Sequence, residues 1–240
     1  MMRVSPGTSG DRPAVLFDLD GTVVDPAGGI TQGIAYALRS MDLAVPADSV
    51  LDAMVGPKLA ESLLRLPGFP AELLPAVIER YRQWYISQGI AMGRPYPGIP
   101  ELLRTLNGWG VPLALATQKP LSLAKVLLST HGLSECFQVV SGSAEDESAQ
   151  TDDTAPPKQL IIATALQGLG YPERAVMVGD RSHDVLGARA NQLDCIGVLW
   201  GFSAPGELAD AGALHTVGSA AELETFLVEY FALEVVHGAL

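Results

Sequence analysis

The chain has 240 residues, of which 48% are hydrophobic and 18% are charged, and its formal net charge is −12 at neutral pH. This hydrophobic fraction supports a folded core and excludes an intrinsically disordered chain. The acidic excess excludes duplex nucleic acid as the main partner, because such binding requires basic side chains that neutralise phosphates. We expect one large domain or two modest ones.

The first residues of the chain and its cysteines indicate the cellular location of the protein. Residues 1–12 are small and polar and lack the apolar stretch of a signal peptide, so we expect a frayed tail there. No apolar run approaches the roughly 18 residues that span a bilayer. Two cysteines, Cys136 and Cys195, are too few for a disulfide framework, and we expect both to be small buried hydrophobes. We therefore expect a cytoplasmic monomer or homodimer that binds neither membrane nor nucleic acid.

Short apolar runs predict buried strands. They lie at 14–19, 111–117, 137–140, 175–179, 195–199 and 215–217. Helical patterns lie between most of them, at 120–131, 158–169 and 185–191. Because strands alternate with helices, the sequence predicts an α/β fold with an open, doubly wound parallel sheet.

One stretch, residues 25–94, breaks this alternation. It contains no convincing strand, and its apolar residues mark three helix faces, around Ile30 to Met41, Leu59 to Leu66 and Leu73 to Tyr85. The segment Pro95 to Gly98 indicates a return hinge. We predict a small all-helical domain at 25–94, inserted after the first strand of an α/β core made of 13–24 and 95–240.

The sharpest motif is Asp18-Leu19-Asp20-Gly21-Thr22, at the end of the first predicted strand. Side chains two residues apart in a strand leave the backbone on the same side, so Asp18 and Asp20 should be neighbours. Two carboxylates this close repel each other unless a metal cation neutralises them or one stays protonated. The alternative is an Asp-Gly hairpin turn, but the alternating pattern that a hairpin needs is absent after Thr22.

A second acidic pair, Asp180 and Asp184, follows the predicted strand at 175–179. In open α/β sheets, ligands bind beyond the carboxyl ends of the strands. Mg²⁺ is held by a few carboxylates together with water and substrate oxygens. Asp180 is the expected direct ligand, whereas Asp184 either supports the metal or caps the next helix.

Two further positions suit an anion. Thr117 ends a predicted strand, and its hydroxyl and the Gln118 amide could donate to a phosphate oxygen at a helix N-terminus. Lys158 opens a predicted helix, where a cation is unfavourable unless an anionic group holds it. Because Lys119 and Lys125 also lie near Thr117, the identity of the phosphate-binding lysine stays open among the three.

In chain order these motifs are Asp-x-Asp-Gly-Thr, a Thr, a Lys and Gly-Asp-x-x-x-Asp. The set resembles the haloacid dehalogenase-like hydrolase superfamily from Val15 to about Leu227, and the helical insertion resembles its small helical cap. Proteins of the phosphoglycolate phosphatase-like branch, and bacterial 5′-nucleotidase-like proteins, share similar stretches at 96–99, 116–120, 179–188 and 196–202. Three features depart from the family pattern. Gln118 stands where Ser or Asn is commoner, Asn191 stands where Gly is usual, and the acidic segment before Lys158 is longer.

The resemblance implies a Mg²⁺-dependent phosphatase. Asp18 would be the nucleophile that forms an aspartyl-phosphate, and Asp20 would be the general acid and then the general base. The Asp18 carboxylate, the Asp20 carbonyl and Asp180 would hold the metal, with Asp184 in support, and Thr117, Gln118 and Lys158 would bind the phosphate. The dehalogenase branch lacks an acid at the position of Asp20, so phosphoryl transfer is favoured over carbon–halogen cleavage.

The substrate is expected to be a small phosphorylated metabolite. Phosphoglycolate is the first candidate and a nucleoside 5′-monophosphate the second, and Lys58 or Arg181 could contact the substrate, Arg181 alternatively the cap. Rival interpretations are a phosphosugar mutase of the same fold, a phospho-accepting signalling domain and a catalytically silent binding protein. The acidic segment 143–157 is expected to be a solvated loop, with a lid over the site as the alternative.

Overall fold

The computed structural model describes residues 13–144 and 157–233. The tail at 1–12 and the acidic stretch 145–156 lie outside the described residues, and so do the predictions made for them. Cys136 and Cys195 are buried free thiols, as predicted. In the described part of the chain, no helix is both long enough and apolar enough to cross a membrane.

A six-stranded sheet forms the centre of the molecule, in the order β5-β4-β1-β6-β7-β8, and every neighbouring pair is parallel. Its strands are β1 (Ala14–Phe17), β4 (Leu113–Pro120), β5 (Val139–Ser143), β6 (Ala175–Gly179), β7 (Asp194–Val198) and β8 (His215–Val217). The first strand is central, with β4 on one side and β6 on the other. This is a topological switch point, where open α/β sheets bind their ligands.

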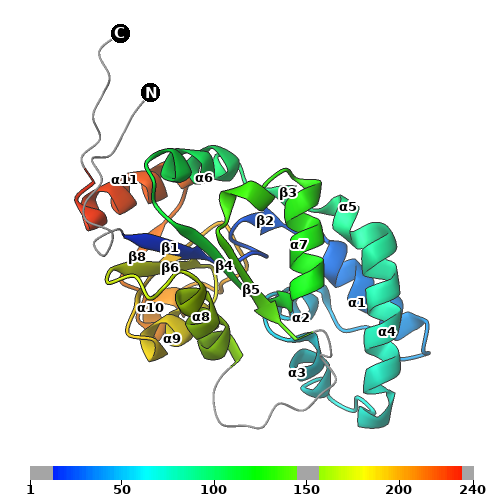
Figure 1. Ribbon diagram of the computed structural model, residues 1–240. Coiled ribbons are helices and arrows are strands. Elements are labelled where there is room, and N and C mark those ends of the chain that lie inside the picture. The colour runs from blue at the N-terminus through cyan, green and yellow to red at the C-terminus, as the bar shows by residue number, and fades with distance from the viewer. Residues whose placement is uncertain (1–12, 145–156, 234–240) are drawn as a thin grey trace.

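Both faces of the sheet are covered by helices, because alternate side chains of each strand point to opposite faces. Val15 and Phe17 belong to a core that includes α6 (Ile99–Gly108), α7 (Leu121–Thr130) and α11 (Ala220–Phe231). Ala14 and Leu16 belong to a second core with α8 (Pro157–Gly168), α9 (Ser182–Ala190) and α10 (Glu207–Ala211). Figure 1 shows α8 to α10 on one side of the sheet and α6 and α11 on the other. The prediction of a doubly wound parallel α/β fold is confirmed.

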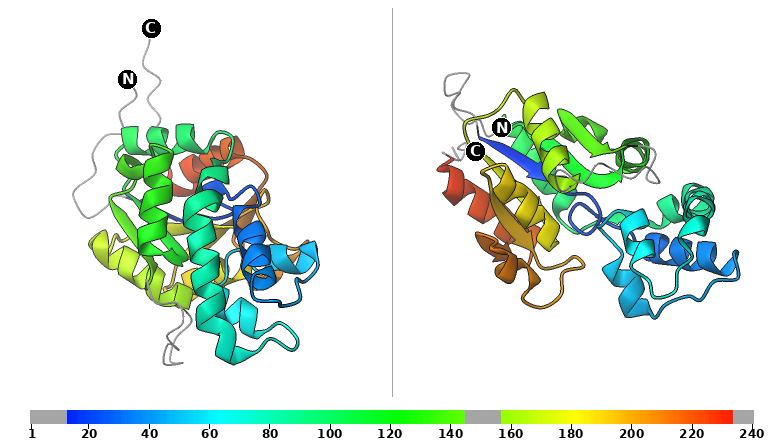
Figure 2. Two further views of the ribbon diagram at one scale, coloured as in Figure 1. Left: turned by 90° about the vertical axis from the view of Figure 1, so that its right-hand side faces the viewer. Right: turned by 90° about the horizontal axis from the view of Figure 1, so that it is seen from below.

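Between β1 and α6, the chain forms a group of helices that we call the helical insertion (residues 29–92). Figure 2 (right) shows these blue to teal helices as a body beside the sheet. The insertion comprises α1 (Gly29–Arg39), α2 (Asp48–Ala53), α3 (Leu59–Leu64), the 3₁₀ turn η1 (Ala71–Leu73), α4 (Leu74–Trp84), the π-helix η2 (Tyr85–Gly89) and α5 (Ile90–Met92).

The two connections to the helical insertion pair with each other. Val24–Asp25 (β2) and Arg94–Pro95 (β3) form a small antiparallel sheet, which the sequence did not predict. Each two-residue segment is too short for a periodic signal, and it becomes a strand because the partner satisfies its backbone groups. The domain boundaries at 25 and 94 stay a prediction.

Several element boundaries differ from those expected. Strand β4 continues past Thr117 to Pro120, with a register irregularity after Ala116. Strand β5 begins two residues later than expected, after a 3₁₀ turn, η3 (Ser134–Cys136). Helix α9 begins at Ser182 instead of Val185, because the Asp184 carboxylate accepts a hydrogen bond from the Arg181 backbone N–H (3.0 Å) and extends the first turn. Helices α2, α6, α10 and α11 were not predicted.

The packing of α6 predicts a large loss of stability on truncation. Leu103 is fully buried in the first core, so Leu103→Ala should lower the free energy of unfolding by about 2–5 kcal/mol. Leu186 on α9 is 52% exposed, and Leu186→Ala should change it by less than about 0.5 kcal/mol. Urea unfolding measures both changes, and equal effects would contradict the placement of α6.

Candidate active site

Three aspartates from separate segments meet at the carboxyl end of the sheet. Asp18 follows β1, Asp180 follows β6, and Asp184 lies in the first turn of α9. Each offers a carboxylate oxygen within 4.8 Å of the other two, and all three side chains are buried. We call this group the acidic cluster. The structure thus brings together three of the four carboxylates that the sequence singled out.

One lysine neutralises part of the acidic cluster. Lys158, from the first turn of α8, is 1% exposed, and its Nζ lies 2.5 Å from Asp18 Oδ1 and 2.6 Å from Asp184 Oδ1. Burial alone would lower the pKa of Lys158, but the two carboxylates raise it above its usual value, so the side chain stays charged. Lys158 is therefore the lysine that reaches Asp18, whereas Lys125 is exposed on α7.

The cluster carries more negative charge than its surroundings compensate. With all three carboxylates ionised, the one ammonium leaves 3 − 1 = 2 formal negative charges. Burial, reinforced by Asp184, raises the pKa of Asp18 to about 7 although Lys158 opposes the shift. Burial, together with Asp184 and Asp18, also raises the pKa of Asp180. For Asp184, burial would raise the pKa, but Lys158, His183 and the Arg181 backbone N–H together outweigh burial, and the pKa is lowered.

A divalent cation fits this arrangement on chemical grounds. The donors are carboxylate oxygens, which Mg²⁺ prefers, and the uncompensated charge equals the charge of the ion. Asp184 also accepts the Arg181 N–H, so the two roles left open for it, helix capping and membership of the cluster, coexist.

Glycines make room for Asp180. Gly21 has a φ of +88°, which favours glycine, and a Cβ at either Gly21 or Gly201 would overlap the Asp180 side chain. The Phe202 N–H donates to Asp180 Oδ2 (2.8 Å). The Gly of the Asp-x-Asp-Gly-Thr motif is thus explained by the backbone's close approach to a carboxylate of another segment.

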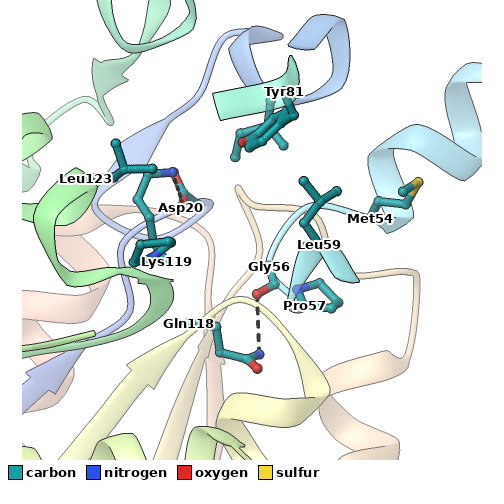
Figure 3. Close-up of a pocket in the computed structure, with 11 residues that line it drawn as sticks. Asp20, Met54, Gly56, Pro57, Leu59, Tyr81, Gln118, Lys119 and Leu123 are labelled. Atoms are coloured by element: carbon teal, nitrogen blue, oxygen red, sulfur yellow. Dashed lines mark hydrogen bonds and ion pairs between the residues drawn. The ribbon is translucent and has the colours of Figure 1, made fainter. Parts of the chain in front are cut away.

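A second ion pair lies beside the acidic cluster. Asp20 Oδ2 is 2.8 Å from Lys119 Nζ, and both side chains are buried (Figure 3). Burial tends to lower the pKa of Lys119, but Asp20 and Tyr85 together raise it well above its usual value. The Thr117 hydroxyl oxygen, also buried, accepts the Lys119 backbone N–H (3.1 Å). Asp20 therefore lies outside the acidic cluster, with a cation of its own.

Two residues assigned to phosphate or substrate, Gln118 and Arg181, contact the helical insertion. The Gln118 amide donates to the Gly56 carbonyl (3.3 Å; Figure 3), and Arg181 donates to the Val55 carbonyl through Nη1 (2.6 Å). Arg181 also donates to Glu207 Oε1 (3.0 Å). The contact with Val55 is the cap contact left open for Arg181, whereas its contact with the substrate stays a prediction. Phosphate binding by Gln118 stays a prediction.

A partly open pocket of about 50 Å³ lies between the insertion and the sheet. Figure 3 shows Asp20 and Lys119 on one side of it and Tyr81 from α4 on another. Lys58 is half-buried at the N-cap of α3 and is not among the lining residues, although its neighbours are. The lining is mostly apolar and consists of Asp20, Ile30, Met54, Gly56, Pro57, Leu59, Tyr81, Gln118, Lys119, Pro120 and Leu123.

Sequence reasoning did not find the partner of Asp20 or the aromatic residues of the insertion. Lys119 stands in the predicted phosphate-binding segment but turns to Asp20, 99 residues away along the chain. Tyr85 has the pattern of a core helix residue and in addition lies over Lys119, with Nζ 4.5 Å from the ring centroid. Residues that line the gap between two domains have no local sequence signal, because both partners have to be placed first.

The raised pKa of Asp18 predicts how stability changes with pH in the metal-free protein. Its pKa is about 7 in the fold against 3.8 ordinarily, so the folded protein binds this proton more tightly than the unfolded chain. The stabilising contribution is therefore complete below pH 4 and is lost as the pH rises towards and through 7. In EDTA, we expect the melting temperature of the wild type to fall over this range.

Asp18→Asn removes the titrating group and should flatten that fall. At pH 8 in EDTA the variant should melt at a higher temperature than the wild type. Asp52→Asn, which changes an exposed carboxylate of α2, is the control and should behave like the wild type. If the melting temperature of Asp18→Asn falls with pH in parallel with that of the wild type, the raised pKa of Asp18 is contradicted.

Comparison with known proteins now identifies the family. The family model for haloacid dehalogenase-like hydrolases matches residues 15–198. A Pseudomonas aeruginosa protein named 5′-nucleotidase is 34% identical over 216 residues, which cover 90% of this chain and 95% of that protein. A Mycobacterium tuberculosis protein named tyrosine-protein kinase PtkA is 40% identical over 199 residues; these cover 82% of this chain but only 65% of that protein.

The structural match agrees. The crystal structure of a predicted phosphatase from Clostridium acetobutylicum superimposes with a TM-score of 0.82 at 36% identity, covering 91% of this chain and 99% of the other. Further relatives are named phosphoglycolate phosphatases. The chain therefore belongs to the haloacid dehalogenase-like hydrolase family, as an enzyme of its phosphatase type.

Proposed function

We propose that this phosphatase hydrolyses a small phosphomonoester, with phosphoglycolate as the first candidate, through a phosphorylated Asp18. The observation that carries the proposal is the division of the aspartates into two groups. Asp18 lies in a cluster suited to a divalent cation, whereas Asp20 lies outside it, paired with Lys119 and lining the pocket. A nucleophile and a proton donor need these two different surroundings.

The metal would be Mg²⁺, held by the Asp18 and Asp180 carboxylates and the Asp20 carbonyl, with Asp184 in support. When bound, the ion supplies positive charge that allows a phosphate dianion to approach the Asp18 carboxylate. The two uncompensated negative charges of the acidic cluster support this assignment.

In the first half-reaction, an oxygen of Asp18 attacks phosphorus in line with the ester bond. The ester P–O bond breaks as the P–O bond to Asp18 forms, and protonated Asp20 gives its proton to the departing oxygen. In the second half-reaction, Asp20 takes a proton from a water molecule whose oxygen attacks phosphorus. The bond between phosphorus and Asp18 then breaks, and inorganic phosphate is released.

Thr117 and Lys158 would hold the oxygens of the phosphoryl group during both steps. Lys158 Nζ lies 2.5 Å from Asp18 Oδ1, so it is beside the attacking atom, and it keeps its charge because of Asp18 and Asp184. Fixed donors at this position stabilise charge that develops on the transferring oxygens.

The size of the pocket favours a small leaving group. A volume of about 50 Å³ holds about three or four water molecules, which suits the two carbons of glycolate. A nucleoside or a sugar exceeds this volume and would have to extend through the open side of the pocket or displace the helical insertion. A nucleoside 5′-monophosphate remains the second candidate, supported by the name of the Pseudomonas relative.

A phosphate-release assay with Mg²⁺ tests the substrate. The panel is phosphoglycolate, the nucleoside 5′-monophosphates, glucose phosphates and phosphotyrosine. We expect phosphoglycolate to have a kcat/KM at least about tenfold above the others, a difference of about 1.4 kcal/mol in transition-state binding. A nucleotide that exceeds phosphoglycolate would overturn the argument from size, and transfer of the phosphoryl group back to a sugar without phosphate release would indicate a mutase.

The acid role of Asp20 makes a separate prediction. Asp20→Asn should slow release of the alcohol from an alkyl phosphate by about 10²-fold or more, because a poor leaving group needs its proton. Release of p-nitrophenolate from p-nitrophenyl phosphate should slow much less, because p-nitrophenolate leaves without one. Rapid mixing with enzyme in excess over substrate measures this first half-reaction alone, since the second, in which Asp20 is the base, is common to both substrates. Asp18→Asn, as the comparison, should abolish both reactions, and equal losses in Asp20→Asn would argue against the acid role.

A further inference from the structure

Lys119 is a buried cation that the reaction scheme above does not use. It comes from the end of β4, its side chain is 5% exposed, and its Nζ lies 2.8 Å from Asp20 Oδ2. A buried ammonium is costly unless it is paired and hydrogen-bonded. The groups that contact the Lys119 ammonium must therefore offset the cost of burying it.

The second contact of Lys119 comes from the helical insertion. Its Nζ lies 4.5 Å from the centroid of the Tyr85 ring, within the range of a cation–π interaction. Tyr85 is 1% exposed and stacks on Tyr81, with ring centroids 5.5 Å apart. The ammonium thus lies between a carboxylate of the sheet end and an aromatic face of the insertion.

Tyr85 begins the π-helix η2. A π-helix is rare, and single π-turns inside α-helices occur frequently at functional sites. The wider turn follows directly on α4, whose Tyr81 lines the pocket. The irregularity therefore lies where the insertion meets Lys119.

The two carboxylate oxygens of Asp20 have different surroundings. Oδ2 is held by Lys119, whereas Oδ1 is buried and receives no hydrogen bond from any residue that the structure describes. Asp20 lines the pocket. Oδ1 is therefore the oxygen left to exchange a proton with a leaving group or a water molecule.

We propose that Lys119 is a positioning residue that holds the acid–base Asp20 by Oδ2 and leaves Oδ1 for proton transfer, and that Tyr85 makes this hold depend on how the helical insertion is seated. The inference rests on the proposed function, because it assumes that Asp20 transfers protons. When the insertion lies against the sheet, Tyr85 and its neighbours keep water from the ion pair. With the insertion displaced, the pair is exposed to water, where such pairs hold their partners weakly.

Lys119→Met tests the first part, because methionine fills similar space without the charge. We expect the rate of alcohol release from an alkyl phosphate, measured with enzyme in excess over substrate, to fall by about 10²-fold, approaching the loss in Asp20→Asn. The rate of p-nitrophenolate release, measured in the same way, should change less than about threefold. Lys119→Arg restores a cation and should recover part of the lost alkyl activity. Lys125→Met, an exposed lysine of α7, is the matched control and should equal the wild type.

The kinetics of Lys119→Met and Asp20→Asn distinguish a failure of the positioning role of Lys119 from a failure of the acid role of Asp20. Suppose that Asp20→Asn slows the alkyl phosphate more than p-nitrophenyl phosphate. Equal losses on both substrates in a folded Lys119→Met protein, or no loss on the alkyl phosphate, would then overturn the positioning role of Lys119 alone. If Asp20→Asn itself shows no such difference, the proposed acid role fails, and the inference fails with it.

Tyr85 variants test the link to the insertion. Tyr85→Phe keeps the ring and should slow alcohol release from the alkyl phosphate less than Tyr85→Leu, which we expect to slow it about tenfold with a smaller change in p-nitrophenolate release. Because Tyr85→Leu also alters the packing of the insertion, its melting temperature is measured beside its kinetics. The same loss on both substrates would show a structural role only and would overturn the part assigned to Tyr85.

Discussion

The architecture of the site depends on one electrostatic constraint, the burial of three carboxylates against a single ammonium. Asp18, Asp180 and Asp184 lie within one coordination sphere, and Lys158 compensates only one of their charges. Burial raises the pKa of Asp18 and Asp180, so the fold is under strain there unless a proton or a cation is present. Such strain is stored at functional sites and is borne by the stability of the surrounding core.

The fold assigns a different cation to each aspartate of the Asp-x-Asp motif. Lys158 from α8 lies beside Asp18, and Lys119 from β4 lies beside Asp20. The first pair belongs to the acidic cluster at the sheet end, whereas the second lies where the sheet faces the helical insertion. Two carboxylates only two residues apart in the chain therefore have different electrostatic surroundings. A nucleophile and a general acid require such a difference.

Sequence patterns predicted the sheet and the acidic cluster because both follow from local signals. Buried strands are continuous apolar runs, and carboxylates at the ends of parallel strands converge at one edge of the sheet. The pairing of Lys119 with Asp20 could not be predicted, because it depends on how β4 continues past Thr117. The contact between Tyr85 and Lys119 depends on the docking of the insertion, and the Arg181 and Gln118 contacts with residues 55 and 56 have the same origin.

The most direct test of the central claim is a titration of the purified protein with Mn²⁺, followed by electron paramagnetic resonance of the free ion. The account predicts one tight site per chain in the wild type and in Asp52→Asn, and an affinity at least about tenfold lower in Asp180→Asn. A wild-type protein without such a site, or an Asp180→Asn variant that binds Mn²⁺ as tightly, would contradict it.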